Sequence, residues 1–309
     1  GTSVNGNGKA NGNGKGRVSA RARADAKRAA EQDHARRVAL LDEPIVLETV
    51  GLTKSYGGIA AVNDVSLQLH DGQVVGLIGP NGAGKTTLFD LISGFTPRNA
   101  GRVLMHDTDM TEWRASQRAA FGLGRSFQDA RLWTSLTVGE ALAVAFERHL
   151  DVRAALPAAF NLPMVQESET ATRKKVEELV EVLGLTAFRD KFIGELSTGS
   201  RRMVEIAAIL AHRPSVLILD EPSSGIAQKE TEALGPLLRQ VQRHTGCSLL
   251  VIEHDMPLIT GLADHLYALE EGAVIAFGTP NEVLHHPRVV ESYLGTAADE
   301  SQLVATRRA

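Results

Sequence analysis

The sequence predicts an α/β protein whose central sheet is mostly parallel. Apolar runs typical of buried strands alternate with helical stretches over most of the chain. One such run leads through a glycine-rich loop directly into a helix, and another ends in an acidic pair. The chain has 309 residues, 43% of them hydrophobic, which is enough to bury a sizeable core.

The composition excludes several classes of protein. A charged fraction of 23% with 29 Gly and 11 Pro is typical of globular proteins, not of disordered or collagen-like chains. No run of 18 or more apolar residues occurs, so no segment is expected to cross a bilayer alone. The single Cys247 excludes an internal disulfide and a cysteine-based zinc site. The net charge of −4 gives no general argument for nucleic-acid binding.

The first 43 residues are expected to form a basic linker or tether. Residues 1–20 are rich in Gly and Asn and lack apolar residues for a core, which favours disorder. Residues 21–41 are rich in Ala and Arg, so they favour a solvated charged helix; contact with an anionic membrane surface or a partner is the alternative. Because the chain starts at Gly1 rather than Met, we expect a processed or excised piece of a longer polypeptide.

Strand patterns begin at about residue 44. Alternating apolar residues predict strands over 45–57 and 61–72, and the short apolar run 73–80 is typical of a buried strand. Further strands are predicted at 216–220, 248–255 and 265–272. Helices are predicted at 85–94, 201–213, 230–244 and 257–264.

The middle of the chain, from about residue 129 to 202, contains no strand-like run. Long helical patterns over 137–150 and 169–185 occupy much of it. We therefore expect a helical insertion between two strands of the sheet.

The glycine-rich loop GPNGAGKTT, residues 79–87, matches the P-loop pattern G-x-x-x-x-G-K-[ST] between a strand and a helix. Glycines let the backbone wrap a phosphate, so that amide N–H groups and the helix start face the anion. Lys85 is expected to reach the β- and γ-phosphates, and the Thr86 hydroxyl to ligate Mg²⁺. The expected nucleotide-binding residues of the loop are Gly79, Pro80, Asn81, Gly82, Ala83, Gly84, Lys85, Thr86 and Thr87.

The acidic pair follows four apolar residues, which bring Asp220 and Glu221 to the carboxyl end of a buried strand. Ligands of open α/β sheets bind at that edge. Asp220 is suited to the Mg²⁺ shell, and Glu221 to polarising a water that attacks the γ-phosphate. The alternative, a surface acidic pair that caps the next loop, is less favoured beside a P-loop.

With LSTGSRR, residues 196–202, about twenty residues before the acidic strand, the chain resembles the ATP-binding-cassette (ABC) ATPases. The resemblance covers about residues 45–296. It implies a P-loop NTPase fold over 44–296, with a RecA-like parallel sheet core and an antiparallel β subdomain. It also implies a helical ABC-specific subdomain at about 129–205 and leaves 297–309 as a C-terminal tail.

The resemblance also implies a dimer, because in this family two cassettes enclose two ATP molecules. The signature helix of one cassette faces the γ-phosphate on the P-loop of the other. Ser197 and Gly199 match that helix and are expected to act in trans. ATP and Mg²⁺ are the implied cofactors, and the partner is a second copy or a related cassette.

Three further residues take their expected roles from the resemblance. Tyr56 resembles the aromatic residue that stacks on adenine, with local packing as the alternative. Gln128 resembles the loop glutamine that touches Mg²⁺ or water and joins the core to the helical insertion. His254 resembles the switch histidine that contacts the γ-phosphate. The expected catalytic residues are Glu221, His254 and Gln128, and the expected metal ligands are Thr86, Gln128 and Asp220.

The sequence departs from the family pattern at two places. The signature commonly reads LSGGQ, but Thr198 and Ser200 replace its first paired Gly and its Gln. Ala227 stands where the family usually has Asp or Asn, which puts communication across the dimer in doubt. ATP hydrolysis is still expected, because the P-loop lysine, the acidic pair and the switch histidine are present. Nucleotide binding without turnover is the alternative that Ala227 favours.

The C-terminal pattern over 277–295 is similar to that of subunits that serve branched-chain amino acid importers. The implied function is to power uptake of branched-chain or hydrophobic amino acids or amides, with lipid or lipopolysaccharide export as the alternative. The implied partners are transmembrane permease subunits at the cytoplasmic face of the membrane, with the cassette peripheral or tethered through its N-terminal segment. Residues 128–150 are expected to form the groove for a coupling helix.

Soluble DNA-repair and translation ATPases form a further class with such cassettes. They would need coiled-coil insertions, zinc hooks or tandem cassettes, whereas this sequence has one P-loop and one cysteine. Its basic N-terminal tract lacks interleaved aromatic residues, so we expect no nucleic-acid partner.

Overall fold

The computed structural model describes residues 20–127, 132–147 and 163–294. The chain divides into two compact units after Ala39. The first contains the helix α1 (Ala20–Ala39), in which Asp33 forms ion pairs with Arg36 (3.9 Å) and Arg37 (2.8 Å). Such pairs one turn apart stabilise a helix by a few tenths of a kcal/mol, about 0.2–0.5 each. The second unit begins with a short 3₁₀ turn, η1 (Leu40–Asp42).

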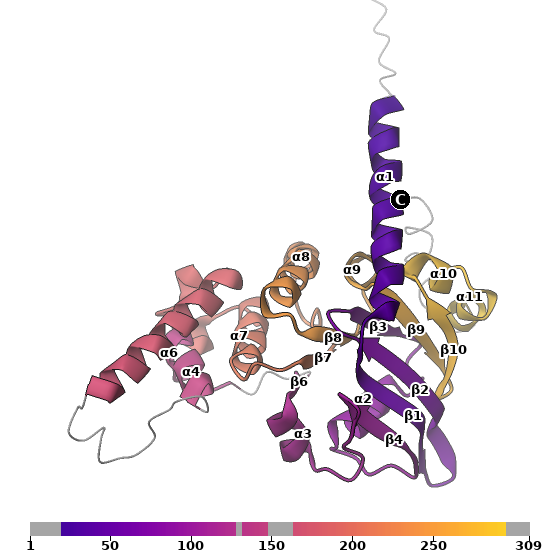
Figure 1. Ribbon diagram of the computed structural model, residues 1–309, viewed down its shortest axis with the longest axis horizontal. Coiled ribbons are helices and arrows are strands. Elements are labelled where there is room, and N and C mark those ends of the chain that lie inside the picture. The colour runs from indigo at the N-terminus through magenta and orange to yellow at the C-terminus, as the bar shows by residue number, and fades with distance from the viewer. Residues whose placement is uncertain (1–19, 128–131, 148–162, 295–309) are drawn as a thin grey trace, which may run out of the picture. The chain divides into compact units, whose positions relative to one another are not determined.

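A six-stranded sheet forms the centre of the second unit, in the order β10-β9-β3-β8-β7-β6 (Figure 1). Its strands are β3 (Val74–Ile78), β6 (Leu123–Arg125), β7 (Val216–Asp220), β8 (Ser248–Ile252), β9 (His265–Glu270) and β10 (Ala273–Gly278). All neighbours are parallel except β9 and β10, which form an antiparallel pair. The predicted α/β class with a mostly parallel sheet is therefore confirmed.

The inner strands β3, β7 and β8 are mostly apolar because both of their faces are buried, with Asp220 at the end of β7 and Ser248 at the start of β8. In β7, Leu217 and Leu219 belong to one hydrophobic cluster, whereas Val216 and Ile218 belong to the other. Strand β8 divides its residues between the two clusters in the same way. The sheet therefore separates two cores, and its carboxyl edge stays free for polar residues.

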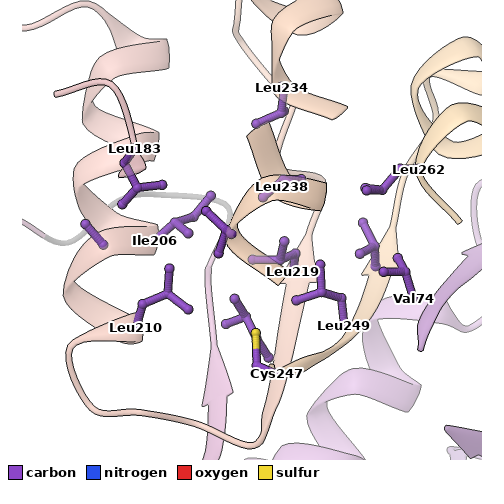
Figure 2. Packing of buried hydrophobic residues seen from close by; sticks show 14 of the residues in the cluster. Val74, Leu183, Ile206, Leu210, Leu219, Leu234, Leu238, Cys247, Leu249 and Leu262 are labelled. Carbon is purple, nitrogen blue, oxygen red and sulfur yellow. The ribbon is translucent and has the colours of Figure 1, made fainter. Parts of the chain in front are cut away.

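One face of the sheet is covered by helices α7 (Thr198–Leu210), α8 (Gln228–Thr245) and α9 (Met256–Leu262). Figure 2 shows Ile206 and Leu210 of α7 in the same cluster as Leu238 of α8 and Leu219 of β7. The cluster also contains Cys247, a buried thiol whose sulfur lies 3.0 Å from the hydroxyl of the adjacent Thr245. The helical insertion therefore shares a core with the strands that carry the candidate site.

The other face packs against α2 (Lys85–Ser93) and a four-stranded antiparallel sheet in the order β2-β1-β4-β5. Its strands are β1 (Ile45–Tyr56), β2 (Ile59–His70), β4 (Ala100–Met105) and β5 (Thr108–Asp109). The predicted strands near its start are present, and β4 and β5 add to them. Helix α3 (Ala115–Phe121) leads from this sheet back to β6.

The described residues between β6 and β7 form helices joined by turns, with an isolated antiparallel bridge between Thr137 and Phe192. The insertion contains α4 (Val138–Phe146), α6 (Pro163–Val182), η3 (Thr186–Phe188) and η4 (Ile193–Glu195) before α7. Thr137 and Glu140 form a capping box at the start of α4, in which the Glu140 amide donates to the Thr137 hydroxyl (3.2 Å). Reciprocal hydrogen bonds from Thr137 lower the pKa of Glu140. The last residues of the helix predicted over 137–150 lie outside the described part.

Two short helices end the described chain, α10 (Pro280–Leu284) and α11 (Pro287–Leu294). A capping box of Thr279 and Glu282 begins α10, with both Thr279 donors 2.8 Å from the same carboxylate oxygen. Within the described ranges, no helix is both long enough and apolar enough to cross a bilayer.

Candidate functional site

The loop between β3 and α2 has a backbone conformation that requires glycine. The φ angles of Gly79 and Gly84 are +152° and +97°. A Cβ atom on Gly84 would lie 2.1 Å from the carbonyl oxygen of Ala61, and one on Gly79 would lie 2.2 Å from that of Leu269. Both obstructing atoms are backbone, so they cannot rotate away. The two glycines therefore let this loop pass close to β2 and β9.

Helix α2 begins without a side-chain cap. Its N-cap is Gly84, and no described side chain accepts a hydrogen bond from the helix start at that position. Amides of the first turn have no partner within a helix, and they carry its partial positive charge. Asn81, Gly82 and Thr86 are exposed around this start. The arrangement is suited to an anion such as a phosphate.

Lys85 lies under the loop with its ammonium group held by main-chain oxygens. Its Nζ donates to the carbonyls of Gly79 (2.7 Å) and Pro80 (3.0 Å). Burial lowers the pKa of Lys85, while the nearby Glu221 and Asp220 carboxylates oppose this shift. A phosphate oxygen would give the buried ammonium a charged partner, which forms stronger hydrogen bonds than a neutral carbonyl.

Asp220 ends β7 with one carboxylate oxygen paired and the other not. Its Oδ2 lies 3.5 Å from a guanidinium nitrogen of Arg125. Its Oδ1 is buried and has no hydrogen-bond partner among the described residues. Burial raises the pKa of Asp220, and Arg125 opposes the shift. A buried acceptor without a partner is rare in proteins, and a cation or a water would satisfy it.

Arg125 is a site residue that sequence reasoning missed. It ends β6 and forms an ion pair with Asp90 of α2 (2.8 Å), so it connects α2 to Asp220 of β7. The rings of Phe95 and Phe127 lie 5.4 and 5.3 Å from its guanidinium carbon. A lone arginine at the end of a three-residue strand carries no motif that would have revealed this role.

The structure brings Glu221 and His254 together. Strand β8 lies between β3 and β7, so the residues that follow it meet both the P-loop and the acidic pair at one edge. The Nε2 atom of His254 lies 2.9 Å from Oε1 of Glu221. The backbone of Glu221 has φ +47°, a strained region for a residue with a side chain.

Glu253 is a second residue that sequence reasoning missed. It is 1% exposed, and its carboxylate accepts hydrogen bonds from both the amide and the hydroxyl of Ser223, at 2.8 Å each. It also accepts one from the amide of His254 (3.0 Å). The available signal was a carboxylate directly after a buried apolar strand and directly before the histidine.

The two signature residues are not brought to the P-loop of the same chain. Ser197 caps α7 by accepting a hydrogen bond from the Ser200 amide (3.2 Å). A Cβ on Gly199 would lie 2.5 Å from a carboxylate oxygen of Glu230, so this glycine lets α8 approach α7. Neither residue forms a hydrogen bond to the P-loop in the part of the chain that the structure describes.

Of the other predicted site residues, the structure describes Tyr56 but not Gln128. Tyr56 is 51% exposed at the end of β1, in the hairpin whose second strand meets the P-loop at Ala61. Gln128 lies outside the described residues. Phe127, just before it, is tied to α7, because its amide donates to Glu205 (3.1 Å) and its carbonyl accepts from Arg202.

Ala227, the departure noted in the sequence, is the N-cap residue of α8 and makes no side-chain capping hydrogen bond. An Asp or Asn there would supply the acceptor that preferred N-caps provide. The helix start is therefore formed without that side-chain contribution.

Two family models match the sequence. One, described as ABC transporter, matches residues 62–224, which include the P-loop, the residues of the α7 start and the acidic pair. The other, described as branched-chain amino acid ATP-binding cassette transporter, matches residues 273–299.

Known proteins resemble the chain over nearly their whole length. The high-affinity branched-chain amino acid transport ATP-binding protein BraF of Pseudomonas aeruginosa is 37% identical over 252 residues, 82% of this chain and 98% of that protein. The lipopolysaccharide export system ATP-binding protein LptB of Escherichia coli is 33% identical over 249 residues, 81% of this chain and 97% of that protein.

A solved structure has the same architecture. It is the ADP conformation of an ATP-binding cassette of an ABC transporter, with a TM-score of 0.68 and 30% identity. The match covers 82% of this chain and 99% of that one.

Proposed function

Because this chain belongs to the ABC transporter family, whose ATP-binding subunits hydrolyse ATP, we propose that it powers the uptake of branched-chain or other hydrophobic amino acids or amides. The observation that carries the substrate class is the second family match, at residues 273–299, together with the similarity to BraF. The test is ATP-dependent uptake of radiolabelled leucine, isoleucine and valine by vesicles that contain the chain and its membrane subunits.

Lipid or lipopolysaccharide export is the second candidate, and the similarity to LptB over 97% of that protein favours it. The same vesicles separate the two proposals. Export predicts ATP-dependent release of lipid to an acceptor without amino-acid uptake, and that outcome would contradict the first proposal.

The proposed nucleotide site is built on the P-loop. We propose that the β- and γ-phosphates bind the start of α2, where they replace the two carbonyls as partners of the Lys85 ammonium. Tyr56 supports the proposed adenine contact by its exposed ring on the neighbouring hairpin. Asn81, Gly82 and Thr87 complete the proposed contacts around the phosphates.

The residues present are compatible with Mg²⁺. The unpartnered Oδ1 of Asp220 and the exposed hydroxyl-bearing Thr86 are oxygen donors of the kind that this ion prefers. Among the described residues no group of three or more His, Cys, Asp and Glu is arranged for a metal, so phosphate and water oxygens would complete the shell. Bound Mg²⁺ would neutralise charge on the β- and γ-phosphates. Gln128 is the further proposed ligand.

Hydrolysis is assigned to the Glu221 and His254 pair. We propose that Glu221 orients a water and accepts its proton, while His254 contacts the γ-phosphate and holds the carboxylate through the 2.9 Å contact. Replacing Glu221 with Gln keeps the shape but removes the base. The variant should bind ATP normally and lose about 10²- to 10⁴-fold in kcat. Phosphate release in the steady state checks this, and equal rates for the variant and the parent chain would contradict the assignment.

A second cassette is proposed to complete the site. Ser197 and Gly199 are at the start of α7, where a helix N-terminus is suited to a phosphate bound by another molecule. A hydrolysis-deficient Glu221→Gln variant should therefore dimerise when ATP is added, as seen by light scattering. A variant that stays monomeric at saturating ATP would contradict the action in trans, whether the natural partner is a second copy or a related cassette.

ATPases of this family work with transmembrane permease components. We propose that the partner contact lies on a groove of about 650 Å³ between α4 and α6. The groove combines apolar side chains, such as Val144 and Val176, with charged ones, such as Glu140 and Arg173. It supports a contact with a short amphipathic helix, at the cytoplasmic face of the membrane. Whether the basic N-terminal segment adds a tether is tested by membrane association of a chain that lacks residues 1–39.

A further inference from the structure

The buried carboxylate of Glu253 connects the two loops that carry Glu221 and His254. Its Oε1 accepts the amide of Ser223, and its Oε2 accepts both the Ser223 hydroxyl and the His254 amide. Ser223 lies two residues after Glu221, on the loop that follows β7, whereas His254 follows β8. The Glu253 side chain therefore links the loop after β7 to the residues after β8.

Apart from a hydrogen bond from the Ser224 amide to its carbonyl (3.0 Å), the hydrogen bonds of Glu221 run to β8 and to the residues just after it. Its backbone is in the left-handed region, with φ +47°. Its amide donates to the carbonyl of Ile252 (3.0 Å), and its side chain meets His254 at 2.9 Å. Each of these contacts joins it to β8 or to the residues just after β8. A shift of the Ser223 loop relative to β8 would therefore change the distance between the carboxylate and the imidazole.

The chemistry of Glu253 favours a role in geometry over a role in stability. Burying a carboxylate at 1% exposure is unfavourable, and hydrogen bonds offset that cost only when the donors are well placed. Burial raises the pKa of Glu253, and the hydrogen bonds from Ser223 and His254 oppose the shift. An apolar side chain would fill a core position at lower cost. What the carboxylate adds is a directional link between four donors, which are the amide and hydroxyl of Ser223 and the amides of His254 and Asp255 (3.4 Å).

We propose that Glu253 is a positioning residue for ATP hydrolysis, because it holds the Ser223 loop against the His254 segment and so keeps Glu221 and His254 in contact. This inference rests on the proposed role of Glu221. Glu253 itself touches neither nucleotide nor water in the reaction. It acts on the rate through the pair that it aligns.

The test is Glu253→Gln in the full chain. The amide keeps the size of the side chain but turns one oxygen into a donor, which can no longer accept the hydrogen bonds of that atom. Misplacement of a reacting group by about 1 Å can lower a rate by about 10²-fold, so we expect kcat to fall by about 10- to 100-fold. The KM for ATP and the dissociation constant of a non-hydrolysable analogue should change by less than about threefold, on the scale of a lost neutral contact.

Glu282→Gln is the matched control. Glu282 accepts from the amide and the hydroxyl of Thr279 as Glu253 does from Ser223, but it caps α10 instead of joining the two loops. The Glu282→Gln variant should keep the kcat of the parent chain. Ser223→Ala, which removes a single hydroxyl donor, serves if Glu253→Gln does not fold, and it should lower kcat in the same direction with unchanged nucleotide affinity.

A double-mutant cycle with Glu221→Gln separates positioning from general destabilisation. If Glu253 acts through Glu221, adding Glu253→Gln to Glu221→Gln should lower the single-turnover rate no further. Equal effects in both backgrounds, or a loss of nucleotide affinity that matches the loss of rate, would overturn the inference.

If Glu221→Gln abolishes hydrolysis but Glu253→Gln has the parent kcat, only this inference falls. If Glu221→Gln hydrolyses normally, the proposed base is wrong and both proposals fall together.

Discussion

The starts of helices α2 and α7 differ in how their free amides are satisfied. Helix α2 begins after Gly84, which has no side chain to offer, and it forms no side-chain cap. Helix α7 begins after Ser197, whose hydroxyl accepts the Ser200 amide at 3.2 Å. Both starts carry the partial positive charge of a helix N-terminus.

The two helix starts therefore need an external anion to different degrees. The α2 start has no side-chain cap, and the buried Lys85 ammonium lies beside it. A bound anion would therefore accept hydrogen bonds from several donors at once. At α7 the Ser197 hydroxyl already has a partner, and a phosphate would have to compete with or share that bond. The α2 start should therefore dominate affinity, and the α7 start should contribute only when a second molecule supplies the phosphate.

Of the changes at the two helix starts, replacing Lys85 with Ala should give the largest loss of ATP affinity. Hydrogen bonds to charged groups contribute about 1.5–3 kcal/mol, so the dissociation constant for ATP should rise by about 10- to 100-fold. Fluorescence titration with a labelled ATP analogue measures the change. An affinity equal to that of the parent chain would show that the α2 start is not the phosphate site.

The next largest effect is expected for Gly84→Ala. The added Cβ would lie 2.1 Å from the Ala61 carbonyl oxygen, and φ is +97°, so backbone strain of about 1–3 kcal/mol should lower the free energy of unfolding and displace the α2 start. Gly82→Ala is the matched control, because its φ is +83° but no atom lies within 4 Å of the added Cβ. Thermal unfolding compares the free energy of unfolding of the two variants, and ATP titration compares their ATP affinity. Gly82→Ala adds backbone strain alone, whereas Gly84→Ala adds strain and the contact with Ala61. Similar losses for the two variants would show that the Ala61 contact does not contribute.

The smallest effect is expected for Ser197→Ala. Loss of an N-cap hydroxyl should lower the free energy of unfolding by about 1 kcal/mol. ATP affinity of the dilute chain should stay the same, because in the proposed arrangement α7 contributes to the site of another molecule. ATPase activity should fall at protein concentrations that permit dimers. A loss of affinity in dilute solution would instead place Ser197 in the site of its own chain.

The strands that the sequence predicted well are those with a long pattern, which are the apolar runs buried on both faces and the alternating strands β1 and β2. The runs at 73–80 and 216–220 are apolar at consecutive positions, because each face of β3 and β7 meets a core. Strand β4 buries only Val103 and Met105, and β6 has three residues, so neither leaves a pattern long enough to predict.

In the candidate site, likewise, residues that belong to a local motif could be predicted, whereas residues that act between distant strands could not. The P-loop and the acidic pair have spacings that depend on local chain geometry, so their residues could be predicted. Arg125 and Glu253 act across strands that are distant in sequence, and their contacts depend on β8 lying between β3 and β7 and on β6 lying beside β7. The order of strands in a sheet cannot be inferred from residue spacing, so the roles of Arg125 and Glu253 could not be predicted from the sequence.

The buried Cys247 has a practical consequence for measuring motion in this protein. It is the single thiol of the sequence, it lies within the core beside α8, and burial raises its pKa, so little reactive thiolate is accessible to reagents. Maleimide dyes added to the native chain should therefore react with cysteines engineered on its surface in preference to Cys247. Pairs of dyes placed near the P-loop and on α6 would then report distance changes during turnover without first removing the natural cysteine.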